Sequence, residues 1–270
     1  MDSFTAQIET LIEEGGLCDH REAIIENILF CYQLLPKRAS SDADIPIGAS
    51  KLAGDADLPP EVPWPTIWQE PGLFLAQINL SELPQDNHIR MNGAHATGLL
   101  LFFVASDYLQ VEETKIIQIP VSRMQDLVRK SSPGPAEQAP AWHPCSVEWR
   151  IAPSFPDHIG GLDSEVNELI DELHDAAHHL PEAPFPASLH HMFGHADEIQ
   201  DHPVSYLEEK LGGPAVYDTL PHYPAVLLQI SSDDEPGFGF VDGGTFYWLI
   251  SRKDLQSGRY DRAVGNLQFF

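Results

Sequence analysis

The sequence predicts an α+β protein that is mainly β, with a duplicated roll-like or two-sheet architecture, two N-terminal helices and one longer helix near residues 162–180. The first observation behind this prediction is a strand motif that occurs twice, as LFLAQINLSELP from Leu73 and as AVLLQISSDDEP from Ala225. The second is that a glycine and an aromatic strand follow each copy after a turn-rich gap, at Gly98 and at Gly244. Two copies of one strand–loop–strand unit indicate an internal duplication with a pseudo-twofold relation.

The helices follow from the spacing of apolar residues. Residues 3–14 carry an apolar stripe with helical period, and residues 19–35 repeat the pattern and close at a proline. The clearest helix spans 162–180, where apolar side chains recur every three or four positions. A further short helix is expected at 203–211, before a pair of glycines.

Strands account for most of the remaining regular structure. Apolar runs bounded by turn residues predict them at 73–80, 98–105, 115–120, 146–151, 224–231, 244–250 and 262–269. Residues 40–71 combine many prolines with several large apolar side chains, which indicates an ordered loop laid on a core. Residues 188–200 are expected to form loop and turn around Gly194.

The domain organisation is simple. We expect residues 1–40 to form a helical segment packed on one β-rich domain, residues 41–270, whose internal copies cover about 45–150 and 185–270. No apolar run approaches the length of a membrane helix, and the first residues lack a basic, apolar leader, so we expect a cytoplasmic protein. Three widely spaced cysteines fit free thiols in a reducing compartment.

The charge of the chain restricts its partners. Fifteen basic residues against 41 acidic ones give a formal net charge of −26. Nucleic acids and anionic membranes are bound through positive patches, so neither is expected as a partner. A strongly acidic surface attracts basic proteins and speeds their encounter, although it also serves solubility alone.

Several short motifs occur in an order that resembles a known family. They are SKLAG at 50–54, Trp64-Pro65, LAQINL at 75–80, GLLLFF at 98–103, HHMFGHADEIQ at 190–200 and LLQISSDD at 227–234. Over roughly residues 45–270 the chain resembles the YwqG-like family of uncharacterised bacterial proteins. The resemblance implies a mainly β, roll-like fold with an internal duplication, and it implies no established activity or catalytic residue. The chain has Ala53-Gly54 where the family often has two adjacent glycines.

One pair of histidines has the spacing of metal ligands. His174 and His178 lie four residues apart in the predicted helix and therefore on one face of it, which is the arrangement that zinc sites use. A third ligand would have to come from His190, His191 or His195. The alternative is a polar helix face without metal.

Two glutamines occupy matching places in the two copies of the strand motif. Gln77 and Gln229 each stand between apolar neighbours on a predicted strand. A buried amide needs hydrogen-bond partners. We expect either hydrogen bonds that hold the two copies together or a polar point in a cleft.

Three further residues are candidates for ligand or partner contact. Asp233 and Asp234 belong to the acidic loop SSDDE, whose carboxylates could bind a hard cation or a basic partner. Trp64, before Pro65, could line the rim of a groove or anchor the loop on the core.

These features leave two classes of function open. The first is a binding or protein-interaction module whose acidic surface engages a basic partner, including the case of a toxin neutraliser. The alternative is a metal-dependent or small-molecule-binding protein that uses the His174/His178 face or a cleft between the copies. No cofactor is predicted, because the chain lacks a nucleotide-binding glycine loop, and catalysis stays an open question.

Overall fold

The computed structural model describes most of the 270 residues. The described ranges are 3–85, 89, 97–108, 113–134, 140–157, 159–178, 183–185, 189–197, 199–200 and 226–270. The predicted helix at 203–211 lies outside them.

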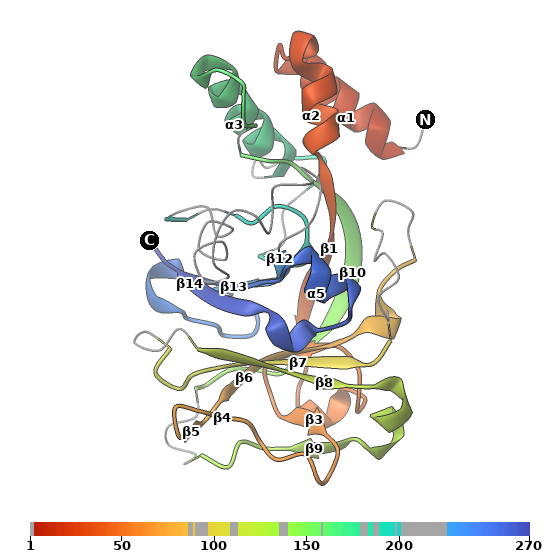
Figure 1. The fold of residues 1–270 in the computed structure, drawn as a ribbon, viewed down its shortest axis with the longest axis vertical. Coiled ribbons are helices and arrows are strands. Elements are labelled where there is room, and N and C mark those ends of the chain that lie inside the picture. Colours follow the sequence, from red (N-terminus) through yellow and green to blue (C-terminus); the bar gives the residue numbers. More distant parts are fainter. Residues whose placement is uncertain are drawn as a thin grey trace.

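One antiparallel sheet of ten strands forms the body of the protein (Figure 1). Its centre is the pair β1 (Leu29–Arg38) and β10 (Cys145–Ser154), which run antiparallel over their full length. Outward from β1 lie β11 (His190–Phe193), β12 (Val226–Ser231), β13 (Thr245–Leu249) and β14 (Val264–Gln268). Outward from β10 lie β2 (Lys51–Leu52), β6 (Leu73–Asn79), β7 (Leu99–Val104) and β8 (Thr114–Ile119).

The sheet curls until its two edges meet. The edge strands β14 and β8 contact each other, so the sheet is nearly closed. Gly265 of β14 lies against the Thr114 side chain of β8, and a Cβ at this position would overlap with that side chain. A glycine is therefore needed for the close approach of the two edges.

Both faces of the first half of the sheet are covered. Along β7, Leu100, Phe102 and Val104 join the main core inside the curl, while Leu99, Leu101 and Phe103 join a second core on the other face. Burial on both faces explains why this strand is a continuous apolar run in the sequence.

Three helices gather at one end of the molecule, at the top of Figure 1. They are α1 (Ser3–Glu14), α2 (Arg21–Asn27) and α3 (Ser164–His178), and their apolar faces share a separate core with Phe155 and Phe185. A short helix α5 (Arg252–Gln256) joins β13 to β14. Within the described ranges, none of the helices has both the length and the hydropathy needed to cross a membrane.

Short 3₁₀ turns connect many of the helices and strands. They are η1 (Cys18–His20), η2 (Asp42–Asp44), η3 (Leu80–Glu82), η4 (Val121–Asp126), η7 (Val241–Gly243) and η8 (Tyr260–Arg262).

The proline-rich segment 40–71 is ordered, which confirms the prediction from its apolar content. Its β3 (Ala56–Leu58) pairs with β9 (Val128–Lys130), and its β4 (Thr66–Ile67) pairs with β5 (Glu70–Pro71). Leu58 and Ile67 are buried in the second core beside β7. The segment therefore forms a layer over the outer face of the first half of the sheet.

Most predicted elements are confirmed, and the fold is α+β and mainly β as expected. The helix predicted at 19–35 is wrong beyond Asn27, because Ile28 is extended (ψ 125°) and Leu29–Arg38 forms the central strand. Four consecutive residues of this strand, Cys31 to Leu34, are buried, and a run buried on both faces cannot be distinguished from a buried helix by periodicity. The loop expected at 188–200 likewise contains β11, which pairs with β1 and β12.

Replacement of Gly194 tests the packing where β11 ends. Gly194 has a φ of +77°, and a Cβ there would lie 2.9 Å from both Cys31 Cβ and Ser154 Oγ. Gly16 has a φ of +70° but open space around it. We expect Gly16→Ala to lower the free energy of unfolding by about 1 kcal/mol and Gly194→Ala to lower it by about 3 kcal/mol, as measured by urea denaturation. Equal losses would contradict this packing.

Candidate functional site

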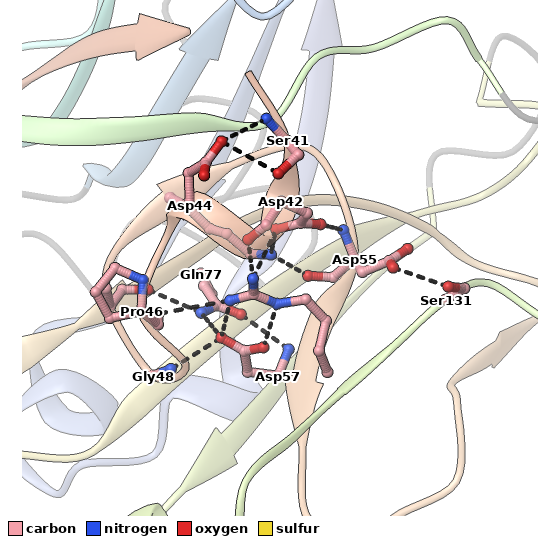
Figure 2. Close-up of polar contacts among 12 residues, drawn as sticks. Ser41, Asp42, Asp44, Pro46, Gly48, Asp55, Asp57, Gln77 and Ser131 are labelled. Carbon is pink, nitrogen blue, oxygen red and sulfur yellow. Dashed lines mark hydrogen bonds and ion pairs between the residues drawn. The ribbon is translucent and has the colours of Figure 1, made fainter. Parts of the chain in front are cut away.

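A buried hydrogen-bonded pair connects β3 to β6. The Asp57 backbone N–H donates to Gln77 Oε1 (3.0 Å), and Gln77 Nε2 donates to Asp57 Oδ2 (2.7 Å) (Figure 2). Gln77 Nε2 also donates to the Ala49 carbonyl (2.8 Å). Both side chains are fully buried, so the two bonds between Asp57 and Gln77 form away from bulk water.

Two cations and a second carboxylate surround this pair. Arg129 Nε donates to Asp57 Oδ1 (2.9 Å), and Lys51 Nζ donates to Asp42 Oδ1 (2.6 Å). Arg129 also bonds to Asp42, so the four charged groups form one network. Lys51 is completely buried, which is rare for lysine and requires such partners.

The network shifts the pKa values of its members. Burial alone would raise the pKa of Asp57, but bonds from Arg129, the Gly48 amide and Gln77 outweigh burial and hold that pKa below its ordinary value. Burial lowers the pKa of Lys51, and the Asp42 carboxylate opposes this shift only in part.

The same network fixes the position of Asp55. The Asp55 backbone N–H donates to Asp42 Oδ2, and its carbonyl accepts a bond from Lys51 Nζ. Ala53 and Gly54 before it are left-handed (φ 56° and 75°), and a Cβ on Gly54 would lie 2.9 Å from Asp42 Cγ. The resulting turn directs the Asp55 carboxylate to Ser131, whose Oγ donates to Asp55 Oδ2 (2.8 Å) (Figure 2).

Asp55 lies in the wall of a pocket of about 620 Å³. Its lining residues are Gly54, Asp55, Trp64, Glu70, Pro71, Leu73, Phe74, Ser106, Ser131, Ser132, Gly134, Pro140 and Trp142. Two carboxylates and three aromatic rings thus share one pocket, and no lysine, arginine or histidine is among these lining residues. A volume of this size is typical of small-molecule sites.

Both tryptophans of the pocket are held in place by contacts with residues that do not line it. Trp64 Nε1 donates to the Gly72 carbonyl (2.9 Å), and its ring meets Phe103 edge-on with the centroids 5.4 Å apart. Trp142 meets Phe238 edge-on at 5.0 Å. Trp64 therefore both lines the pocket and anchors the proline-rich loop on the core, which are the two roles that the sequence left open.

The model of a family described as a domain of unknown function (DUF1963) matches residues 50–268. The chain belongs to the DUF1963 family. The match begins directly before β2 and ends with the last residue of β14, so β1 is the strand of the main sheet that precedes it. No curated protein matches the chain in sequence.

Gln229 of this DUF1963 domain has the same kind of partner as Gln77. The Asp197 backbone N–H donates to Gln229 Oε1 (3.0 Å), and Gln229 Nε2 donates to Asp197 Oδ2 (2.6 Å). Each glutamine thus bonds to its own aspartate, and neither lines the pocket near Trp64.

The segments that carry the two aspartates also correspond. SKLAGDAD at 50–57 and HHMFGHAD at 190–197 share the pattern glycine, any residue, alanine, aspartate. Phe193 and Gly194 are left-handed (φ 62° and 77°), as are Ala53 and Gly54. Lys51 pairs with Gln77 across its strands, and His191 pairs with Gln229 in the corresponding register.

Asp233 is engaged by the protein itself, whereas Asp234 is exposed. The Ser231 backbone N–H donates to His190 Nδ1 (3.2 Å), so the proton of the neutral ring is on Nε2 and is donated to Asp233 Oδ2 (3.0 Å). The Asp234 carbonyl accepts a bond from the Arg38 guanidinium. The acidic loop is therefore tied to β11 and to the end of β1.

His174 and His178 face the inside of the helical end. His174 Nδ1 donates to the Phe155 carbonyl (3.1 Å), and His178 Nδ1 donates to the Phe185 carbonyl (2.7 Å). Their rings are 5.0 Å apart, and both line a small cavity together with His191 and Asp197. Within the described part of the chain, no three His, Cys, Asp or Glu side chains are arranged to hold a metal ion.

Two of the three thiols are shielded. Burial raises the pKa values of Cys31 and Cys145 to about 12. Cys145 Sγ donates to the His143 carbonyl (3.4 Å) rather than to its ring. Neither thiol is therefore an activated nucleophile at neutral pH.

Sequence reasoning missed the aspartates of this site. The shared pattern at 50–57 and 190–197 was a signal for Asp57 and Asp197. Asp55 and Glu70 carry no such signal, because acidic residues in a turn-rich segment are usually solvated.

Substitution of Gln77 tests the buried pair. Gln77→Leu removes the acceptor of the Asp57 N–H and one donor to its carboxylate, and we expect the free energy of unfolding to fall by about 3 kcal/mol. Gln118→Leu, at an exposed position of β8, is the matched control and should change it by less than about 0.5 kcal/mol. Similar values for both variants in urea denaturation would refute the role of the pair.

The pH dependence of stability tests the environment of His190. Burial holds the pKa of His190 below its ordinary value of 6.5, and Asp233 offsets this only in part. The unfolded chain therefore binds the extra proton first, so stability is complete above pH 6.5 and falls as the pH decreases below it, by at most about 1.4 kcal/mol per pH unit for this group. Denaturation at several pH values should show a smaller decline in this range for His190→Gln. An identical decline would exclude His190 as its source.

Proposed function

We propose that this DUF1963 protein is a binding module that engages a basic protein partner through its acidic surface. The observation that supports the proposal is that few of the described basic side chains are left to pair with the surface carboxylates. Most of the described basic side chains are already bonded within the chain, and these are Arg21, Arg38, Lys51, Arg123, Arg129, Lys130, Arg150 and Arg259. The excess of carboxylates is therefore left to face solvent and partners.

The helical end supplies an acidic surface of the required kind. The exposed acidic residues of α3 are Glu165, Glu168, Asp171, Glu172 and Asp175, and this helix has no lysine or arginine. Its neighbours α1 and α2 add the exposed Glu13, Glu14, Glu22 and Glu26. Ile25 and Leu169 are 37% and 38% exposed there, which adds apolar contact area to the charge. Like charges on one surface raise the local concentration of a cationic partner.

We also infer that the chain is an internal duplication of the YwqG-like type. The matching Gln–Asp pairs, the left-handed turns before the two aspartates and the strand order on either side of β1 and β10 support this inference. In that arrangement the copies begin at β1 and at β10, upstream of residues 45 and 185, and each copy contributes its first strand to the other, because β11 pairs with β1 and β2 pairs with β10. The two copies could then separate only by unfolding the sheet.

Binding to a short polyarginine peptide tests the proposed function. We expect saturable binding at low salt that weakens steeply as salt is added, because the attraction is between exposed charges. A triple variant Glu165→Gln, Glu168→Gln and Glu172→Gln should bind several-fold more weakly. The control variant Asp107→Asn, Glu113→Gln and Glu148→Gln removes the same charge from exposed positions elsewhere.

Equal binding by the two triple variants would show that net charge alone governs the interaction, and it would contradict a partner site on the helical end. Absence of binding at low salt would overturn the proposal itself.

A further inference from the structure

We propose that the pocket lined by Trp64 and Trp142 binds a cationic group of the guanidinium or primary ammonium class. This site lies in the first half of the sheet and is separate from the acidic helical end, so the inference goes beyond the proposed function. Free amines and the arginine or lysine side chains of a protein share this chemistry, and the experiment below distinguishes the two sources.

The charge of the pocket selects a cation. Asp55 and Glu70 both line it, and none of the lining residues is basic. Ser131 bonds to Asp55 Oδ2, and among the described residues no donor reaches Asp55 Oδ1. Lys51 and Arg129 are close in the chain's fold, but their charges are matched by Asp42 and Asp57. Arg129 interacts with Asp55 as well, but less than with Asp57 and Asp42, so the two pocket carboxylates add a negative potential that the nearby cations offset only in part.

The aromatic rings suit the same ligand. The only hydrogen-bond donor of the Trp64 side chain is committed to the Gly72 carbonyl, so its indole offers the pocket carbon and π surface. Phe74 and Trp142 add further ring surface. A cation near an aromatic face is attracted by the ring quadrupole, most strongly for tryptophan. Tryptophan rings combined with carboxylates favour a cation over a neutral ligand of the same shape.

Hydrogen bonds hold two parts of the pocket wall, the loop that leads to Trp64 and the turn that carries Asp55. Lys130 Nζ donates to the carbonyls of Pro59, Pro60 and Val62 (2.9, 2.9 and 2.8 Å), which fixes the proline-rich loop that leads to Trp64. The buried network fixes Asp55 through its backbone. A pre-formed site loses little conformational entropy when a small ligand binds.

Isothermal titration with a pair of isosteric probes tests the inference. Butylguanidinium carries the charge, and butylurea has nearly the same shape without it. We expect the wild-type protein to bind butylguanidinium saturably and butylurea at least about tenfold more weakly. Trp64→Leu and Glu70→Gln should each weaken butylguanidinium binding by several-fold to tenfold. Trp68→Leu is the control, because Trp68 is 68% exposed and does not line the pocket.

The outcomes separate this inference from the proposed function. Equal affinity for the two probes, or unchanged affinity in both Trp64→Leu and Glu70→Gln, overturns the pocket as a cation site. Glu70 is exposed, so its amide variant is expected to fold even if Trp64→Leu does not. Butylguanidinium binding without polyarginine binding supports a free amine as the ligand and removes the protein partner. Polyarginine binding that is unchanged in Trp64→Leu and Glu70→Gln keeps the protein partner at the helical end and leaves a free amine as the ligand of this pocket.

Discussion

The burial of the Asp57 carboxylate is the constraint on which the first half of the molecule depends. Removing a carboxylate from water costs several kcal/mol unless charged and polar groups replace the water. Arg129, Gln77 and the Gly48 amide do so, and they come from β9, β6 and the segment before β2. Satisfying one side chain thus brings three separate parts of the chain together. Asp197 and Gln229 form a comparable pair in the second half.

The network also divides the charge of the protein into two parts. Inside, two carboxylates are matched by Lys51 and Arg129. Outside, the remaining acidic residues have few cations left to pair with, which concentrates negative charge on the helical end and in the tryptophan-lined pocket. Asp55 and Asp57 show the division most clearly, since the first lines the pocket and the second is fully buried.

Much of the fold could be predicted from local patterns. Helix α1 has the predicted limits. The strands of the repeated motif lie where apolar runs bounded by turn residues predicted them. The central strand β1 could not be predicted, because its neighbours β10 and β11 are over one hundred residues away in sequence and only their pairing makes it a strand. The candidate site was predicted in part. Trp64 lines the pocket, but no local pattern distinguishes Asp55 and Glu70 from solvated turn residues.

A crystal structure of the protein with butylguanidinium would test the central claim most directly, namely that the buried network holds Asp55 in the wall of a cation-binding pocket. We expect the guanidinium within hydrogen-bond distance of Asp55 or Glu70, with its plane or its alkyl chain against the ring of Trp64 or Trp142, and with the Asp42–Lys51 bond intact. A probe bound elsewhere on the acidic surface, with this pocket unchanged and without ligand, would contradict the account.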